Sequence, residues 1–263
     1  MPETPVLDEA LAFAIKLARA TGDLLVGFYT RADIQFRYKQ DHTLLTEADL
    51  AADRFISEQI QSAFPQDAIL SEEMNTSFPA DGRPTWIIDP LDGTTNFSQR
   101  IHYWGVSIAR VVDGWPELAA LYFPIINELY SARRGAGAAL NGIAFTVPDE
   151  GTQPVAFFTC DSRVLKHYHS DIAYKPRILG SAAYNFCAVA SGASIVGIES
   201  IPKVWDIAGS WLVLQEAGGA CTTLKGQLFP LKPGMDYAGV KFPVLGAANP
   251  ALLEKSKGQI HFR

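Results

Sequence analysis

The stretch that says most about this chain is WIIDPLDGTTNF, residues 86–97. Its apolar start predicts a buried strand, and Pro90 prevents the hydrogen-bond ladder of that strand from continuing. Asp89 and Asp92 stand at the carboxyl end of the strand, Gly93 permits a tight turn, and the two threonines that follow open a short helix. Two carboxylates held close together repel each other unless a cation lies between them. Carboxylate oxygens suit Mg²⁺, and free N–H groups at a helix start suit a phosphate.

Three further acidic motifs are ambiguous when each is taken alone. Glu72 and Glu73 follow a predicted strand, but a charged loop has the same pattern. Asp206 precedes an apolar helix, where aspartate is a favoured N-cap. Thr46 and Asp49 nearly form a capping box, so Asp49 could serve the helix alone. The sequence therefore offers a metal-binding and a structural interpretation for each motif.

Composition limits the classes of partner. The chain has 263 residues, of which 48% are hydrophobic and 19% charged, as in globular proteins. Its 22 basic and 28 acidic residues give a net charge of −6, which argues against nucleic acid and anionic membranes as partners. Three cysteines without a C-x-x-C pair favour neither a disulfide framework nor a zinc site. Without a signal peptide or an apolar run of about 20 residues, we expect a soluble cytoplasmic protein.

Hydrophobic periodicity predicts a layered α+β fold and not a doubly wound parallel one. Residues 7–29 have helical spacing, which Gly22 could interrupt, and a second helix is expected over 46–63. A composition change near 145–153 suggests two halves of one compact unit, 1–147 with most of the metal ligands and 148–263 with the substrate wall. Other helices are expected over 181–190 and 206–217, and strands over 68–70, 86–88, 106–112, 118–123, 128–132, 155–158, 195–198, 220–224 and 244–247, with Asp113-Gly114 as a hairpin turn.

In combination, these motifs resemble the inositol monophosphatase family of Mg²⁺-dependent, lithium-sensitive phosphatases. The resemblance covers about residues 10–250 and implies an αβαβα sandwich of the inositol monophosphatase and fructose-1,6-bisphosphatase type, assembled as a homodimer. The motifs follow the order of the family: 46–49, 71–73, 89–95, 130–135 with 141–142, 180–183, and 205–209 with 216–219.

The resemblance implies two or three Mg²⁺ ions. Glu72, Asp89 and the carbonyl of Leu91 would hold the first ion. Asp89, Asp92 and Asp206 would hold the second, so that Asp89 bridges the two. A third, weaker ion would depend on Glu72 and water. Paired metals of this kind activate a water on one side of a phosphate ester and neutralise the leaving oxygen on the other.

The same resemblance implies the roles of the remaining site residues. Thr94 with Glu72 would orient and deprotonate the attacking water, and Asp49 would support that pair. Glu199 would bond substrate hydroxyls, which favours inositol 1-phosphate over an ester with a second phosphate. Substrate binding is thereby assigned to Leu91, Asp92, Gly93, Thr94, Gly180, Ser181, Ala182, Glu199 and Asp206.

Three alternatives remain open. The same chemistry could act on fructose-1,6-bisphosphate, histidinol phosphate, phosphoadenosine phosphate or a broad range of sugar phosphates. An aspartyl-phosphate phosphatase of the haloacid dehalogenase type also has two aspartates after a strand, but they are separated by one residue, whereas two separate Asp89 from Asp92. A non-enzymatic sensor of metal and sugar phosphate is the third alternative.

Some positions depart from the family pattern or fall outside it. Ser71 stands where the family commonly has glycine, and the segment 159–163 has no clear counterpart. Lys39 and Lys203 lie close in sequence to site motifs, but we expect both to be solvated. The five histidines, at 42, 102, 167, 169 and 261, are expected on the surface.

Overall fold

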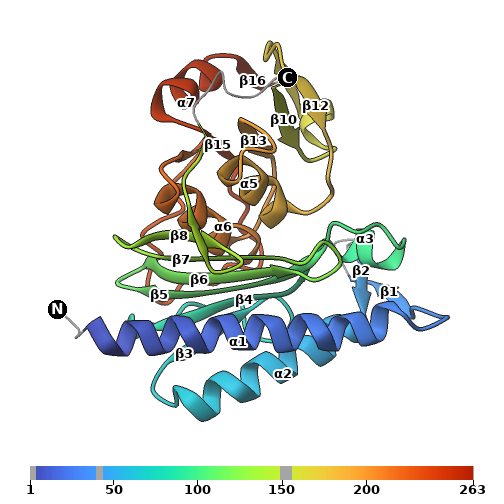
Figure 1. The fold of residues 1–263 in the computed structure, drawn as a ribbon, viewed down its shortest axis with the longest axis vertical. Coiled ribbons are helices and arrows are strands. Elements are labelled where there is room, and N and C mark those ends of the chain that lie inside the picture. Colours follow the sequence, from blue (N-terminus) through green and yellow to red (C-terminus); the bar gives the residue numbers. More distant parts are fainter. Residues whose placement is uncertain (1–3, 40–43, 149–155, 263) are drawn as a thin grey trace.

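The computed structural model describes residues 4–39, 44–148 and 156–262 and has alternating layers of helices and sheets (Figure 1). Helices α1 (Thr4–Tyr29) and α2 (Glu47–Ala63) cover one face of a seven-stranded sheet. Helices α5 (Ala182–Ala190) and α6 (Val204–Glu216) lie between this sheet and a five-stranded one, with α7 (Pro250–Lys257) beyond it. The predicted αβαβα sandwich is confirmed.

The seven-stranded sheet is antiparallel apart from its first pair. Its strands are β3 (Ala68–Ser71), β4 (Thr85–Asp92), β5 (Gly105–Val112), β6 (Trp115–Phe123), β7 (Glu128–Arg133), β8 (Gly137–Leu140) and β9 (Ile143–Phe145), in that spatial order. Strand β3 runs parallel to β4. The turn between β5 and β6 has Asp113 and Gly114 at φ 51° and 77°, the left-handed pair that a two-residue hairpin needs.

The five-stranded sheet is mixed, in the order β12-β10-β13-β15-β14. Its strands are β10 (Phe157–Cys160), β12 (Lys175–Arg177), β13 (Val196–Glu199), β14 (Ala220–Thr223) and β15 (Val244–Ala247). The ends of the predicted strands agree with the structure within two residues, with two exceptions: β4 continues four residues beyond the predicted end at Ile88, and β6 begins three residues before Leu118. Val155 of the predicted strand 155–158 lies outside the described residues. Small elements complete the fold: β1 (Phe36–Tyr38) with β2 (Leu44–Thr46), β11 (Tyr168–Ser170) with β16 (Ile260–Phe262), and the short helices α3 (Thr94–Ser98) and α4 (Val164–His167).

The large sheet buries both of its faces. On β5, Ile108 packs in the cluster under α1 and α2, whereas Ala109 and Val111 face the cluster formed with α5 and α6. Because successive side chains of a strand point to opposite faces, the central strands β4, β5 and β6 are mostly apolar and buried, whereas β9 at the edge is largely exposed. Strand β4, which carries the acidic motif, is therefore packed on both of its faces.

Two sequence predictions about helices are wrong in detail. Helix α1 is continuous, and Gly22 serves close packing, because a Cβ there would collide with the Tyr122 ring on β6. Helix α6 begins at Val204, so Asp206 is not its N-cap. The Asp206 carboxylate instead accepts the Lys203 N–H from within the first turn, at 2.8 Å.

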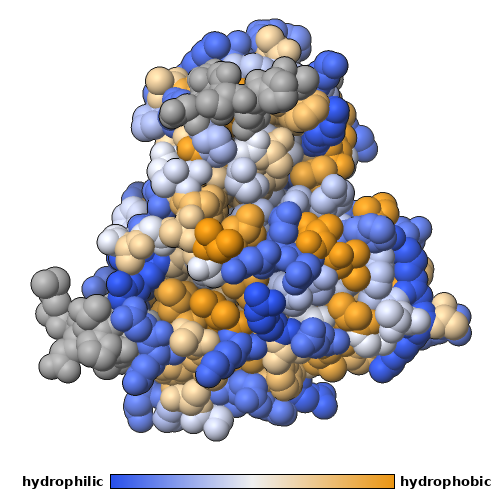
Figure 2. Space-filling model, in the orientation of Figure 1, coloured by the Kyte–Doolittle hydropathy of each residue, from blue (hydrophilic) through white to orange (hydrophobic). Residues whose placement is uncertain are grey.

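No helix among the described residues is long and apolar enough to cross a membrane. On the face that Figure 2 shows, apolar residues form separate groups among hydrophilic ones. This face therefore offers no single large apolar patch as a dimer interface. The division of the chain at residue 148 stays a prediction, since residues 149–155 lie outside the described part. Of the five histidines, four are exposed as expected and His42 is outside the described residues.

Candidate active site

Strand β4 brings two aspartates of the acidic motif into the interior. All eight residues of β4 are buried, and Asp89 and Asp92 are only 2% and 5% exposed. The pairing of β4 with β5 shifts between Asp89 and Asp92. A bulge of this kind bends a strand and redirects its side chains. The Leu91 N–H donates to Asp89 at 3.0 Å, so the bend is fixed by the aspartate itself.

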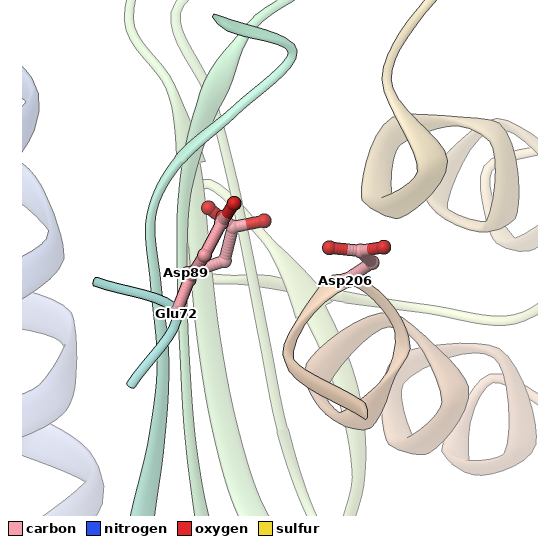
Figure 3. Close-up of side chains that lie close together, drawn as sticks. All are labelled: Glu72, Asp89 and Asp206. Atoms are coloured by element: carbon pink, nitrogen blue, oxygen red, sulfur yellow. The ribbon is translucent and has the colours of Figure 1, made fainter. Parts of the chain in front are cut away.

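Three carboxylates from distant parts of the sequence meet at this bend (Figure 3). Glu72 follows β3, Asp89 lies on β4, and Asp206 lies in the first turn of α6. One carboxylate oxygen of each lies within 4.8 Å of the others. Figure 3 shows the carboxylates of Glu72 and Asp89 side by side, with that of Asp206 facing them. The parallel pairing of β3 with β4 puts the first two carboxylates at one edge, and α6 supplies the third.

Burial and mutual repulsion shift the acidity of this cluster. Burial, with the charges of Glu72, Asp92 and Asp206, raises the pKa of Asp89 well above its usual value. Burial, with the charges of Glu72 and Asp92, raises the pKa of Asp206 to about 8. Such shifts mean that the protein alone stabilises the neutral form of these groups, whereas a bound cation would stabilise the ionised form.

Asp92 lies beside the cluster but is bonded differently. Its carboxylate accepts hydrogen bonds from the Ser181 hydroxyl and, at 3.2 Å, from the Ala182 N–H, both at the start of α5. Burial raises its pKa to about 6, although the bond from Ser181 opposes the shift. The structure thus brings Glu72, Asp89 and Asp206 together and joins Asp92 to the predicted substrate segment.

A hydrogen-bonded chain supports Thr94 beside the cluster. The Thr94 hydroxyl lies 3.1 Å from Asp49 Oδ1 and 3.0 Å from the Leu91 carbonyl. Asp49 Oδ2 accepts the Thr46 N–H at 2.7 Å and completes the predicted capping box of α2. Burial raises the pKa of Asp49 to about 6. Asp49 therefore both caps a helix and orients Thr94, so the two interpretations of this residue are compatible.

Two glycines shape the backbone around the site. Gly93 has φ 83°, and a Cβ there would lie 2.9 Å from the Tyr103 carbonyl oxygen. Gly180 has φ 80°, and its Cβ would lie 2.6 Å from Asn96 Oδ1. Both positions therefore require glycine on two grounds, left-handed backbone and lack of space.

Several site residues escaped the sequence analysis. Asn96 Nδ2 donates to the carbonyls of Tyr103 and Leu179, at 2.6 and 2.7 Å, and so ties α3 to the segment that precedes α5. Asn185 Nδ2 donates to Glu199, which is 4% exposed. Asparagine gives no catalytic pattern in a sequence, so only the tertiary contacts identify these two.

Lys39 contradicts the expectation of a solvated side chain. Its ammonium donates to Glu72 Oε1 at 2.7 Å and to Glu73 Oε1 at 2.5 Å. Although burial opposes the shift, the two glutamates raise the pKa of Lys39. Within the part of the chain that the structure describes, Lys39 is the one cation in ion-pair contact with the carboxylate cluster. Lys203 is likewise not freely solvated, because its ammonium donates to the Ala238 carbonyl.

The predicted site residues surround one cavity of about 830 Å³. Asp49 is the exception, and it reaches the cavity through its bond to Thr94. The lining includes Glu72, Asp89, Leu91, Asp92, Gly93, Thr94, Gly180, Ser181, Ala182, Glu199 and Asp206.

The donor set at the end of this cavity fits a hard cation. All three clustered side chains offer carboxylate oxygens, the ligands that Mg²⁺ prefers. In the described residues, a single lysine offsets their charge, and only at Glu72. The burial of mutually repelling carboxylates is therefore an observation of this structure that a divalent cation would explain.

Comparison with known proteins decides the family. The model of the inositol monophosphatase family matches residues 6–259, nearly the whole chain. The chain belongs to this family. It is 33% identical over 225 residues to a histidinol-phosphatase of Chlorobaculum parvum, covering 82% of this chain and 86% of that protein. It is 34% identical over 228 residues to Nus factor SuhB of Escherichia coli K12, covering 82% and 85%.

Solved structures agree with the sequence matches. The IMPase of Thermotoga maritima has a TM-score of 0.81 and 27% identity, covering 95% of this chain and 97% of that one. The predicted resemblance is thereby confirmed, and the chain is a member of a phosphatase family. Relatives with different names share this similarity, so membership does not determine the substrate.

Hydrogen bonds show that Glu216 and Ser71 stabilise the scaffold around the site. Glu216 accepts the N–H groups of Gly135 and Gly137, each at 2.9 Å, and so fixes α6 to the turn between β7 and β8. Ser71, where the family commonly has glycine, accepts the Met74 N–H at 3.1 Å and stabilises the turn that carries Glu72 and Glu73.

Asp53 is a further residue that the sequence analysis missed, and it acts on the same turn. It is fully buried on α2, and its carboxylate accepts the Glu73 N–H at 3.3 Å and the Ser57 hydroxyl at 3.1 Å. It stands one helical turn after Asp49, so one face of α2 supports both the acidic turn and Thr94. The helical spacing of the two aspartates was the only signal in the sequence.

Proposed function

We propose that this chain is a Mg²⁺-dependent phosphate monoester hydrolase that acts on a phosphorylated polyol, with inositol 1-phosphate as the first substrate to test. The observation that supports this proposal is the meeting of Glu72, Asp89 and Asp206 at one end of a cavity, beside the Thr94–Asp49 pair. A homodimer, which the family resemblance implies, and a cytoplasmic location, which the sequence predicts, are part of the proposal.

The proposal places Mg²⁺ on the acidic residues. Glu72, Asp89 and the Leu91 carbonyl would hold one ion, and Asp89, Asp92 and Asp206 a second, with a third ion weaker if present. Bound Mg²⁺ supplies two effects, a lower pKa for its water and neutralisation of charge on the phosphate ester. For Asp92 to take part, its carboxylate must share its oxygens with the Ser181 hydroxyl.

Thr94 is proposed to orient the attacking water. Above a pH of about 6, Asp49 is ionised and takes the hydrogen bond from the Thr94 hydroxyl. The lone pairs of the hydroxyl then accept a hydrogen bond from water, and this fixes the water in line with the ester. Glu72, at the same end of the cavity, takes the proton. The N–H groups of Gly93 and Thr94 are proposed to hold phosphate oxygens, as at other helix starts.

Glu199 and Asn185 are proposed to recognise the alcohol part of the substrate. Glu199 ends β13 and lines the same cavity as the acidic motif of β4. A carboxyl group bonded on one side by Asn185 keeps oxygens available for substrate hydroxyls. Histidinol phosphate is the second candidate, because a relative of 33% identity carries that name.

A phosphate-release assay tests this proposal. The purified chain is incubated with inositol 1-phosphate, histidinol phosphate and fructose-1,6-bisphosphate, each with Mg²⁺ and with a chelator. We expect Mg²⁺-stimulated phosphate release from at least one ester and none with the chelator. Absence of stimulated release across the panel would refute the proposal, and a trapped phosphate on Asp89 would refute the direct attack by water.

A further inference from the structure

Three cations lie at the mouth of the cavity whose floor is acidic. Arg163, Lys166 and Lys241 line the same cavity as the carboxylate cluster, and all three are exposed, whereas Asp89 and Asp92 are buried. No carboxylate of the described residues lies within ion-pair distance of any of the three (residues 40–43 and 149–155 are outside that description). The cavity therefore has an acidic floor and a basic rim, which we define as Arg163, Lys166 and Lys241.

The Asp161 carboxylate fixes the position of two rim residues without neutralising them. Its Oδ1 accepts the N–H groups of Arg163 and Val164 at 2.6 and 3.0 Å, and its Oδ2 accepts the Ser200 N–H at 2.5 Å. The turn that starts α4 is thereby tied to the end of β13, next to Glu199. Because all these donors belong to the backbone, the side chains of Arg163 and Lys166 remain available.

Lys203 anchors the loop that carries the third rim residue. Its ammonium donates to the Ala238 carbonyl and lies 5.7 Å from the centre of the Trp205 ring. These contacts tie the loop that carries Lys241 to the start of α6, where Asp206 lies. Lys203 also lies close enough to Asp236 to help lower the pKa of that carboxyl, after the larger effect of the Thr76 hydroxyl. Lys203 is therefore not part of the basic rim.

We propose that the basic rim binds a second phosphate of the substrate while the first phosphate is hydrolysed at the acidic floor. This inference rests on the proposed function, and among phosphorylated polyols and sugars it favours esters with two phosphates over monophosphates such as inositol 1-phosphate. A cavity of about 830 Å³ lies toward the upper end of the range for small-molecule sites, roughly 300–1,000 Å³. It leaves room beyond a single phosphorylated ring. The fork of an arginine is suited to bidentate phosphate binding.

The basic rim affects the binding of two candidate substrates, histidinol phosphate and an ester with a second phosphate. Histidinol carries an amine and an imidazole, so a rim of three cations disfavours histidinol phosphate. Repulsion between Glu199 and a second phosphate applies only if the two are adjacent. Glu199 is buried and bonded to Asn185, whereas the rim is exposed at the mouth. A second phosphate at the rim leaves Glu199 to the hydroxyls between the two ends.

A matched pair of substrates isolates the contribution of the second phosphate. Fructose 1-phosphate and fructose-1,6-bisphosphate are assayed with the unmodified chain, with Arg163→Gln/Lys166→Gln, and with Lys255→Gln/Lys257→Gln. The last variant removes two exposed charges from α7, which does not line the cavity. We expect the rim variant to lower the ratio of kcat/KM for bisphosphate over monophosphate by about tenfold, as for charged hydrogen bonds that solvent partly screens. The control variant should leave the ratio unchanged.

Two outcomes would overturn the inference. An unchanged ratio would mean that the rim is merely solvated. An equal loss for both sugars would mean that the rim attracts any anion from a distance, an effect that weakens with salt. Hydrolysis of histidinol phosphate should rise in the rim variant, and a fall would also contradict the proposal. Lys241→Gln, on a separate loop, repeats the test if the double variant does not fold.

A binding measurement separates this inference from the proposed function. Both sugars are titrated by calorimetry with Mg²⁺ into Thr94→Ala and into Thr94→Ala/Arg163→Gln/Lys166→Gln. The rim should contribute about tenfold to the affinity for the bisphosphate and little to that for the monophosphate. If no ester is hydrolysed but this difference is found, the proposed function fails and the rim site stands. If an ester is hydrolysed but the two variants bind the bisphosphate with equal affinity, the proposed function stands and the rim site fails.

Discussion

Replacing Asp206 by asparagine should stabilise the metal-free protein. Asp206 is one of three carboxylates within 4.8 Å, and its pKa rises from 3.8 to about 8 through burial and the charges of Glu72 and Asp92. Asparagine has the same shape, so its amide oxygen can still accept the Lys203 N–H. The substitution removes a buried charge and leaves the packing of α6 intact.

The size of the effect follows from the pKa. A carboxyl whose pKa is raised on folding favours the unfolded state as soon as the pH exceeds 3.8, and the penalty grows until about pH 8. Each pKa unit corresponds to about 1.4 kcal/mol, which sets an upper limit of about 5 kcal/mol at pH 8. Because neighbouring carboxylates share the repulsion, we expect a gain of about 2 kcal/mol for the single substitution. For a chain of this size, that gain raises Tm by about 4–8 °C.

Thermal unfolding in a chelator, at pH 4, 6 and 8, measures this gain. The Tm difference between Asp206→Asn and the unmodified chain should be absent at pH 4 and largest at pH 8. Saturating Mg²⁺ should reverse the order, because ligand binding to the native state stabilises the unmodified chain by about 3 kcal/mol at a hundred times Kd. Asp236→Asn is the control, since Asp236 is exposed and its pKa is lowered by the Thr76 hydroxyl. An Asp206→Asn variant that is less stable than the unmodified chain at pH 8 in chelator would refute the reasoning.

Three further substitutions test other parts of the site. Asp89→Asn should lower kcat by orders of magnitude while the circular dichroism spectrum stays native, and near-normal turnover with Mg²⁺ would contradict the two-metal proposal. Thr94→Val removes the hydroxyl beside Asp49 and should lower kcat by about 10²–10³, with KM changed little, whereas Thr94→Ser should recover most of the loss in steady-state assays. Gly180→Ala should lower the free energy of unfolding by about 2 kcal/mol in urea titrations, because its Cβ would press on Asn96 at a left-handed position; full stability would show that the segment adapts.

Local motifs were predictable because their contacts lie within a few residues. The Thr46–Asp49 capping box, the strand and turn of residues 86–97, and the Asp113-Gly114 hairpin each depend on backbone preferences that the sequence encodes directly. The layered fold followed from the apolar periodicity of these elements and from the order of the motifs. The predicted start of α6, at Asp206, lies only two residues after the observed start at Val204.

The rest of the site depends on contacts between distant residues, which no local pattern shows. Lys39 pairs with a glutamate 33 residues away, and Asn96 bonds to a carbonyl 83 residues away. Lysine and asparagine are both common on solvent-exposed surfaces, so neither residue type indicates a buried contact. Asp53 could be recognised only after α2 was known to pack beside the acidic turn. Tertiary packing, and not propensity, decides these positions.

The charge of the chain has two parts that act at different places. Five acidic residues, Asp49, Glu72, Asp89, Asp92 and Asp206, are assigned to the proposed site, and without them 22 basic residues face 23 acidic ones, a formal charge of −1. Two Mg²⁺ ions would reduce the formal charge of −6 to −2. Ionised carboxylates repel a phosphate, so the floor of the cavity is expected to accept the ester only after a cation is bound. The basic rim attracts an anion whether or not the floor holds metal. If the proposals for the acidic floor and the basic rim hold, an ester with two phosphates would have a preferred direction of entry, with its first phosphate at the metal-loaded floor and its second at the exposed rim of the same cavity.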